Sequence, residues 1–142
     1  MTRQTLLPDR IFDSITGAML TDKALVVDGE RVVAVLDSRD ATEAVDLAGH
    51  TIVPGLIDVH THLASPPDNG QGFAGVVRRS GAQDALLGAR HADITLQAGF
   101  TTVRDVGVWR AFSDVALRDA IDSGWVPGPR MMVAGAYVTC PG

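Results

Sequence analysis

The stretch TIVPGLIDVHTHLASPP, residues 51–67, joins a run of apolar and β-branched residues to two histidines one residue apart. Side chains two residues apart on a β-strand point to the same face, so His60 and His62 are expected to aim the same way, with Asp58 one step further down that face. Two neutral imidazoles converging from one rigid strand suit a borderline metal such as zinc. A strand end whose histidines are partly exposed or bonded to backbone carbonyls is the alternative, and the flanking sequence has to decide between the two.

The residues that follow alternate between strand and helix patterns. The run 55–62 is continuously apolar up to its histidines, which is typical of a strand buried on both faces of a parallel sheet. Helical spacing of apolar residues predicts helices over 82–99 and 113–124, and further strands over 100–107 and 130–138. Strands separated by helices at this spacing indicate βαβ crossovers. With about 30 residues per unit, residues 54–142 match the first three strands of a TIM-like (β/α)₈ barrel, a fold of ~250 residues.

Details of these elements carry further expectations. Gly99 and Gly124 are expected to end the two helices, and Ser113 is a plausible N-cap for the second one. The glycine-rich segment 64–81 after the histidines is expected to be a loop, which either covers a substrate or is only a mobile connection.

The first third of the chain has the pattern of β-structure. Two apolar runs flank Asp28-Gly29, which predicts a type I′ hairpin, and residues 44–55 resemble a second pair of short strands with a turn near Ala48-Gly49. Val53-Pro54-Gly55 then breaks the pattern, because proline cannot donate to a sheet. We therefore expect an α/β protein with two parts: a small β-sandwich segment over 1–53 and the barrel portion over 54–142.

The composition of the chain limits which binding partners and which cellular compartment are expected. The net charge is −5, and the longest basic cluster is one arginine pair, which argues against nucleic acid or an anionic membrane. No apolar run approaches the ~20 residues of a membrane helix, and the N-terminus lacks a signal-peptide core. The single cysteine, Cys140, fits a reducing cytoplasm and is expected to be a spectator. Assembly into a homo-oligomer is left open.

Three blocks occur in order: DLAGHTIVPGLIDVHTHL at 46–63, LQAGFTTVRDVG at 96–107 and LRDAIDSGWVPGPRMMVAG at 117–135. Together they resemble the metal-dependent amidohydrolase superfamily, in its imidazolonepropionase and prolidase-like branch. The resemblance implies that His60 and His62 hold the more buried metal of a site with one or two divalent ions, usually zinc. It also implies further ligands on later strands, namely a carboxylated lysine, two histidines and an aspartate, that this sequence does not include. Lys23, the only lysine, lies in the β-segment.

The implied activity is metal-dependent hydrolysis of an amide C–N bond in a small peptide-like substrate, most like a prolidase-type dipeptidase or carboxypeptidase. A cyclic-amide hydrolase of the imidazolonepropionase kind is the alternative within the enzyme class, and a non-catalytic truncated fragment is the alternative outside it. The rest of the barrel would come from the same gene or a second chain. Alone, the chain is expected to be inactive and poorly stable, because the inward faces of Ile57, Val59, Val103 and Met132 would lack their covering layers.

Other polar residues have weaker claims to the site. Asp58 is expected either to orient a metal ligand or to be a buried capping carboxylate. Asp105 falls at the C-terminal end of the second predicted strand, where barrel enzymes place their sites, and Tyr137 ends the third, from which its side chain could reach substrate. His91, inside the first helix, is expected to be solvated or packed, and His50 is given no role. No residue of the chain is assigned as the catalytic base.

Overall fold

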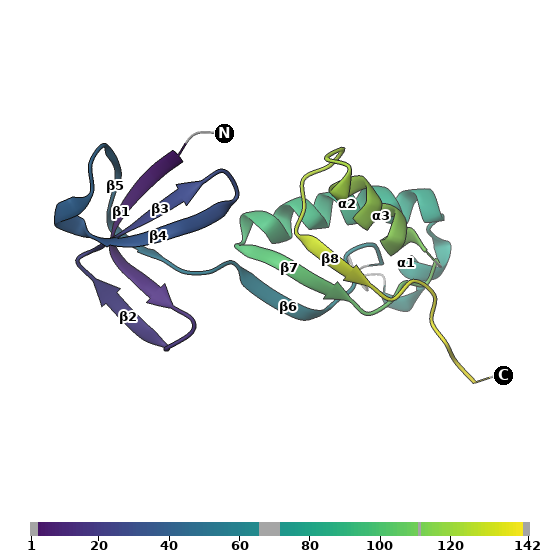
Figure 1. Ribbon diagram of the computed structural model, residues 1–142. Helices are drawn as coiled ribbons and strands as arrows, with labels where there is room; N and C mark the ends of the chain where they lie inside the picture. The colour runs from purple at the N-terminus through teal and green to yellow at the C-terminus, as the bar shows by residue number, and fades with distance from the viewer. Residues whose placement is uncertain (1–2, 66–71, 111, 141–142) are drawn as a thin grey trace. The chain divides into compact units, whose positions relative to one another are not determined.

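The computed structural model describes residues 3–65, 72–110 and 112–140 (Figure 1). The chain divides into two compact units, Met1–Pro54 and Gly55–Gly142. Unit 1 consists of strands and a short 3₁₀ turn, whereas unit 2 alternates strands with helices. Among the described residues, no helix is long and apolar enough to cross a membrane.

Unit 1 is one mixed sheet built around a long central strand. Its strands are β1 (Arg3–Asp13), β2 (Ala18–Thr21), β3 (Lys23–Asp28), β4 (Arg31–Asp37) and β5 (Ala44–Ile52), with the 3₁₀ turn η1 (Ser38–Asp40) between the last two. One edge of β1 pairs in parallel with β5, and the other pairs antiparallel with β3 and then β2. The small β-sandwich segment expected over 1–53 therefore forms one sheet within the described residues, because β2, β3 and β5 all pair with β1 and β4 pairs with β3.

Two local expectations for unit 1 also need correction. The hairpin forms, but Asp28 pairs with Arg31, so its turn is Gly29-Glu30. Of the two, only Gly29 has a positive φ, of 59°, which is the pattern of type II′ and not of type I′. Residues 44–52 form the single strand β5 and not a strand pair, because the whole segment runs beside β1 and takes up the irregularity near Gly49 as a register shift.

Unit 2 confirms the expected parallel α/β arrangement. It contains β6 (Leu56–Thr61), α1 (Gly72–Arg78), α2 (Gly81–Gln97), β7 (Phe100–Asp105), α3 (Ser113–Asp122) and β8 (Arg130–Val133). The strands pair in the order β6-β7-β8, and both pairings are parallel. In Figure 1, α2 and α3 lie on one side of this sheet. The segment 64–81, expected to be a loop, includes the short helix α1, and residues 66–71 within it lie outside the described part.

The helix ends show which local signals hold. Ser80 and Gln83 form a reciprocal capping box at the start of α2, and Gly99 follows the end of that helix with φ +93°. Ser113 is not the N-cap of α3, since Phe112 occupies that position with φ +67° and the Ser113 hydroxyl donates backwards to the Arg110 carbonyl. The third strand ends at Val133, earlier than expected.

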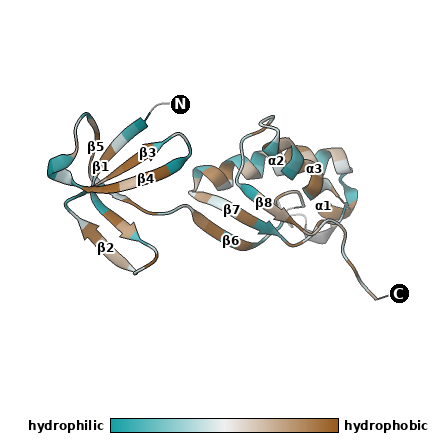
Figure 2. Ribbon diagram, viewed as in Figure 1, coloured by the Kyte–Doolittle hydropathy of each residue, from teal (hydrophilic) through white to brown (hydrophobic). Residues whose placement is uncertain are grey.

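The sheet of unit 2 buries one face and exposes the other. Val103 of β7 and Met131 of β8 pack beneath the helices in a cluster with Ala92 and Leu117. The opposite face carries large apolar side chains that remain open, including Ile57, 66% exposed, Val59, 58%, and Met132, 65%. Figure 2 shows hydrophobic residues along β6. In this chain β6 is therefore not buried on both faces, and the expected lack of a covering layer over Ile57, Val59 and Met132 is confirmed. The placement of Val103 on the same uncovered face is wrong.

A β-bulge in β6 separates Asp58 from the histidines. Asp58 pairs with Val103 and Thr61 pairs with Asp105, so three steps along β6 match two steps along β7. Directly paired residues point to the same side, which puts Asp58 and Thr61 on the helix-covered face and turns His60 away from it. The Asp58 carboxylate accepts the His60 amide, 3.0 Å away, and stabilises the bulge. The expectation that Asp58 shares the histidine face is therefore wrong.

Candidate metal centre

The candidate site lies where the three parallel strands of unit 2 end. Three loops begin here, after Thr61, after Asp105 and after Val133, and they contact one another through short polar bonds. The Val106 amide donates to the Thr61 carbonyl, and the Ala134 amide to the Asp105 carbonyl. This edge of a parallel sheet is where α/β proteins place their ligand sites.

The structure brings the two histidine rings together. The His60 and His62 ring centroids lie 5.5 Å apart, with an angle of 75° between the ring planes. A tetrahedral zinc ion with Zn–N bonds of about 2.0–2.1 Å would hold the centroids of two imidazoles about 5 Å apart. The observed spacing therefore fits two ligands of one ion with little rearrangement.

The His62 ring is oriented by the loop after β7. Its Nδ1 lies 2.8 Å from the Gly107 carbonyl oxygen. A carbonyl can only accept, so Nδ1 carries the proton and Nε2 keeps its lone pair for a metal. A ligand histidine whose other ring nitrogen donates to a backbone carbonyl is the usual arrangement at metal sites. The donor chemistry of His62 thus fits a divalent cation.

Tyr137 reaches the same carbonyl from the third loop. Its hydroxyl donates to the Gly107 carbonyl at 3.0 Å and lies 3.5 Å from His62 Nδ1. The sequence placed Tyr137 on a strand, but it follows a turn at Gly135, where φ is +78° and the amide is bonded to the Asp114 carboxylate. Burial, reinforced by the nearby carboxylates of Asp105 and Asp114, raises the pKa of Tyr137, so its hydroxyl stays a donor.

Asp105 lies beneath the site and is inaccessible to solvent. Its Oδ2 accepts the Leu63 amide at 2.7 Å, and its Oδ1 accepts the Gly107 amide at 3.2 Å. Burial raises the pKa of Asp105 despite those two bonds. A carboxylate enclosed in this way holds backbone in place and has no open side toward a substrate.

Two residues that the sequence left aside also hold the loop after His62. The His91 ring, on α2, lies 3.2 Å from the Leu63 carbonyl, which makes it a packing residue as expected. Gly88 of α2 allows close approach of the loop, since a Cβ there would lie 3.0 Å from the Ala64 Cα.

The sequence reasoning did not identify Asp114, whose carboxylate accepts the Gly135 amide before Tyr137. An acidic residue in the first turn of a helix was the available signal, but such residues are common and seldom reach a neighbouring loop.

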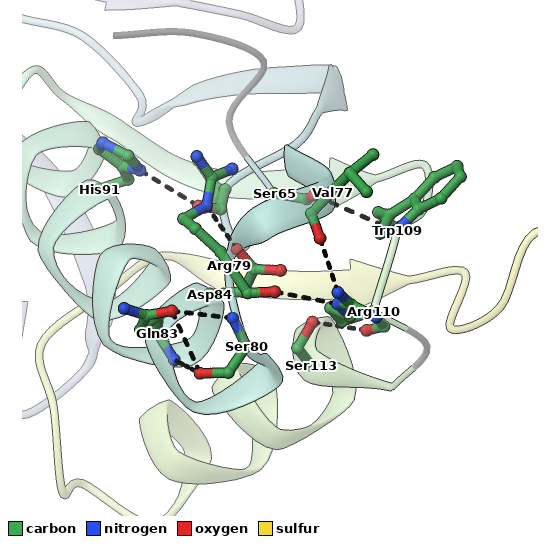
Figure 3. A network of polar contacts seen from close by, with 11 residues as sticks. Ser65, Val77, Arg79, Ser80, Gln83, Asp84, His91, Trp109, Arg110 and Ser113 are labelled. Carbon is green, nitrogen blue, oxygen red and sulfur yellow. Dashed lines mark hydrogen bonds and ion pairs between the residues drawn. The ribbon is translucent and has the colours of Figure 1, made fainter. Parts of the chain in front are cut away.

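A second polar network joins the segment after α1 to the loop after β7 (Figure 3). The Arg79 Nε lies 2.7 Å from the buried Asp84 carboxylate, and Arg110 donates to the carbonyls of Arg79 and Val77. The Trp109 amide also approaches the Ser65 hydroxyl, at 3.5 Å. These bonds tie the surroundings of the site together without entering it.

The metal-ligand set within the described residues stops at the two histidines. No group there combines three or more histidine, cysteine, aspartate or glutamate side chains in positions to hold an ion. Lys23 belongs to unit 1, where its ammonium lies 2.6 Å from the Asp37 carboxylate. His60 and His62 fit two positions of a metal centre whose other ligands would have to come from elsewhere.

Comparison with known proteins decides the family. The model of the amidohydrolase family matches residues 51–141, which include both histidines and all three strands of unit 2. The chain belongs to the amidohydrolase family. Members of this family generally bind divalent metals, in agreement with the donor chemistry of the histidine pair.

Relatives of this amidohydrolase chain include several activities. It is 34% identical over 94 residues to an imidazolonepropionase of Halobacterium salinarum and 27% identical over 108 residues to an adenine deaminase of Sinorhizobium fredii. These alignments cover 66% and 70% of this chain, but only 20% and 19% of the relatives. Among solved structures, a Xaa-Pro dipeptidase with bound methionine is 30% identical with a TM-score of 0.81, covering 96% of this chain and 34% of the dipeptidase. The amidohydrolase chain thus spans about a fifth of these curated relatives and about a third of the solved dipeptidase.

Proposed function

We propose that this chain contributes the first two metal ligands of a metal-dependent hydrolase that cleaves amide C–N bonds, most like a prolidase-type dipeptidase. The observation that carries the proposal is the histidine pair, with ring centroids 5.5 Å apart and His62 Nδ1 bonded to the Gly107 carbonyl. The likeness to the Xaa-Pro dipeptidase, at 30% identity over nearly the whole chain, supports the substrate class. We further propose that residues 54–142 are the opening strands of a (β/α)₈ barrel.

Zinc is the metal that we propose. When bound, a divalent ion would polarise the substrate carbonyl and lower the pKa of a water to near neutrality. His60 and His62 would hold it through ring nitrogens, and the Gly107 carbonyl would keep the His62 Nδ1 proton away from the metal side. The Tyr137 hydroxyl, which donates to that same carbonyl, would limit its movement. The proton transfers of hydrolysis would need a base other than Asp105, which is enclosed.

A cyclic-amide hydrolase is the second candidate. The 34% identity to an imidazolonepropionase favours it. The likeness to an adenine deaminase adds deamination as a third possible reaction, which also cleaves a C–N bond. All three chemistries use the same kind of activated water, so the residues described here serve each of them equally.

The metal part of the proposal is tested on this chain with Co²⁺ or Zn²⁺. The ring signals of His60 and His62 should shift on titration, and His60→Ala or His62→Ala should each abolish saturable binding. His50→Ala is the control, since that residue lies in unit 1 and its ring bonds to the Ala48 carbonyl. Binding that survives both site substitutions, or that is lost with His50→Ala, would contradict the assignment.

The reaction is tested on the longer protein to which the chain belongs. A chelator should remove activity, and added metal should restore it. A panel of Xaa-Pro dipeptides, cyclic amides and adenine then separates the candidates. Turnover of none of these substrates by the metal-loaded protein would refute the proposed activity while leaving the metal site standing.

A further inference from the structure

One carboxylate connects both elements that fix His62. Asp105 is fully buried, and its two oxygens accept amides from different loops, Leu63 after β6 and Gly107 after β7. The Leu63 amide belongs to the peptide bond that joins Leu63 to His62. Gly107 supplies the carbonyl oxygen that accepts the hydrogen bond from His62 Nδ1, 2.8 Å away. Asp105 therefore holds the His62 backbone directly and the partner of its ring indirectly.

We propose that Asp105 is the positioning residue of the metal site: its carboxylate fixes the ring orientation and proton position of His62 by bonding the Leu63 and Gly107 amides. This inference rests on the proposed metal function. Asp105 does not touch the metal or the substrate, and it acts only through the two loops.

The burial of Asp105 supports this role. Burying a carboxylate is costly unless its oxygens accept hydrogen bonds, and both Asp105 oxygens accept backbone amides. No other side chain of similar shape has two acceptor oxygens for these two amides. Asparagine has nearly the same shape, but it presents an amino group where one oxygen was. In Asp105→Asn the remaining oxygen would keep the shorter bond to Leu63, and the amino group would face the Gly107 amide, donor against donor.

The contacts around Leu63 sharpen the expectation. Its carbonyl accepts from His91, and Ala64 next to it packs on Gly88, so the loop keeps its general course without Asp105. What Asp105 adds is the link between this loop and Gly107. Loss of the carboxylate should therefore loosen Gly107 more than it displaces Leu63.

The experiment reads the His62 ring in the metal-free chain by ¹⁵N NMR. The wild type should show one tautomer, protonated at Nδ1. Asp105→Asn should give a mixture of tautomers, with amide exchange at Gly107 accelerated at least tenfold. Asp84→Asn is the matched control, because Asp84 is equally buried but bonds to Arg79 and not to either loop. The control should lose stability without changing the His62 signals.

Metal titration supplies the second readout. Asp105→Asn should weaken Zn²⁺ binding about 10–100-fold, the usual range for a residue that orients a ligand. If wild type binds no Zn²⁺, the proposed function fails, while the tautomer measurement still tests Asp105. Should the variant not fold, hydrogen-bond couplings from the Leu63 and Gly107 amides to the Asp105 carboxyl carbon are measurable in wild type. Absence of those couplings, or an unchanged His62 tautomer in Asp105→Asn, would overturn the inference.

Discussion

Gly107→Ala is the substitution that most directly probes the loop carrying the carbonyl partner of His62. Gly107 has φ +127°, a conformation that side chains other than glycine rarely adopt. A Cβ built there would lie 2.3 Å from Tyr137 Cε1 and 2.7 Å from Cδ1. Carbon atoms prefer separations of about 3.5–4.0 Å, so the tyrosine ring would have to move by more than ~1 Å.

The magnitude follows from two terms. Placing alanine in so sparsely populated a conformation costs about 1–3 kcal/mol. Moving the ring breaks the 3.0 Å bond from the Tyr137 hydroxyl to the Gly107 carbonyl, a bond worth about 0.5–1.5 kcal/mol. The free energy of unfolding should therefore fall by about 1.5–4.5 kcal/mol.

Urea unfolding followed by circular dichroism measures that loss, and the chain's single tyrosine gives a separate NMR signal for the ring movement. Gly124→Ala is the control, since Gly124 also has a positive φ, +71°, but a Cβ there would meet nothing within 4 Å. It should cost about 1–2 kcal/mol, the usual cost of placing a Cβ in the left-handed region, and leave the tyrosine signal unchanged. Equal losses for the two variants, with the tyrosine signal unmoved in both, would refute the reasoning.

Three further predictions concern packing, pH and the open sheet face. Gly88→Ala should lower stability by about 1–3 kcal/mol in urea unfolding, because its Cβ would lie 2.9 Å from Leu117 Cδ2 and 3.0 Å from the Ala64 Cα. Burial raises the pKa of Asp105 above 3.8, so the folded state binds its proton more tightly than the unfolded state does; its contribution should be greatest below pH 3.8 and decline as pH rises through the raised pKa. Asp105→Asn should remove that decline from a profile of unfolding free energy against pH, and an identical profile would contradict the assignment. Finally, a dye for apolar surfaces should bind the chain, and Met132→Ser, at a position 65% exposed, should reduce the bound fluorescence without lowering stability.

The sequence predicted the backbone of unit 2 well because its signals are local. Alternation of strand and helix patterns, the Gly99 stop and the order of the three blocks depend on neighbouring residues, and the parallel sheet confirms them. The helix start at Phe112 was missed because a left-handed aromatic N-cap contradicts the usual preference for serine. The Ser113 hydroxyl bonds to the Arg110 carbonyl and so does not cap the helix, despite the preference of serine for the N-cap position.

The details of the site were less predictable because they depend on pairing between distant segments. His60 and His62 could be placed together from their spacing alone. The position of Asp58 could not, since the extra residue in β6 is visible only against the register of β7. The meeting of Tyr137 with Gly107 likewise depends on a turn that Asp114 stabilises from a different helix. Sequence patterns do not encode such contacts at any fixed spacing.

The bulge in β6 makes the His-x-His segment sensitive to length. Because three steps along β6 match two steps along β7 between Asp58 and Thr61, deletion of Val59 would remove the bulge and leave a regular ladder. The deletion would also remove the Val59 carbonyl that accepts from Arg104 Nε at 2.8 Å, and the two-residue spacing at which the Asp58 carboxylate accepts the His60 amide. Substitutions at Val59, which is exposed, would leave the register intact. We therefore expect functional variants of this chain to accept many different residues at position 59. Insertions and deletions between Asp58 and Thr61 should not be accepted.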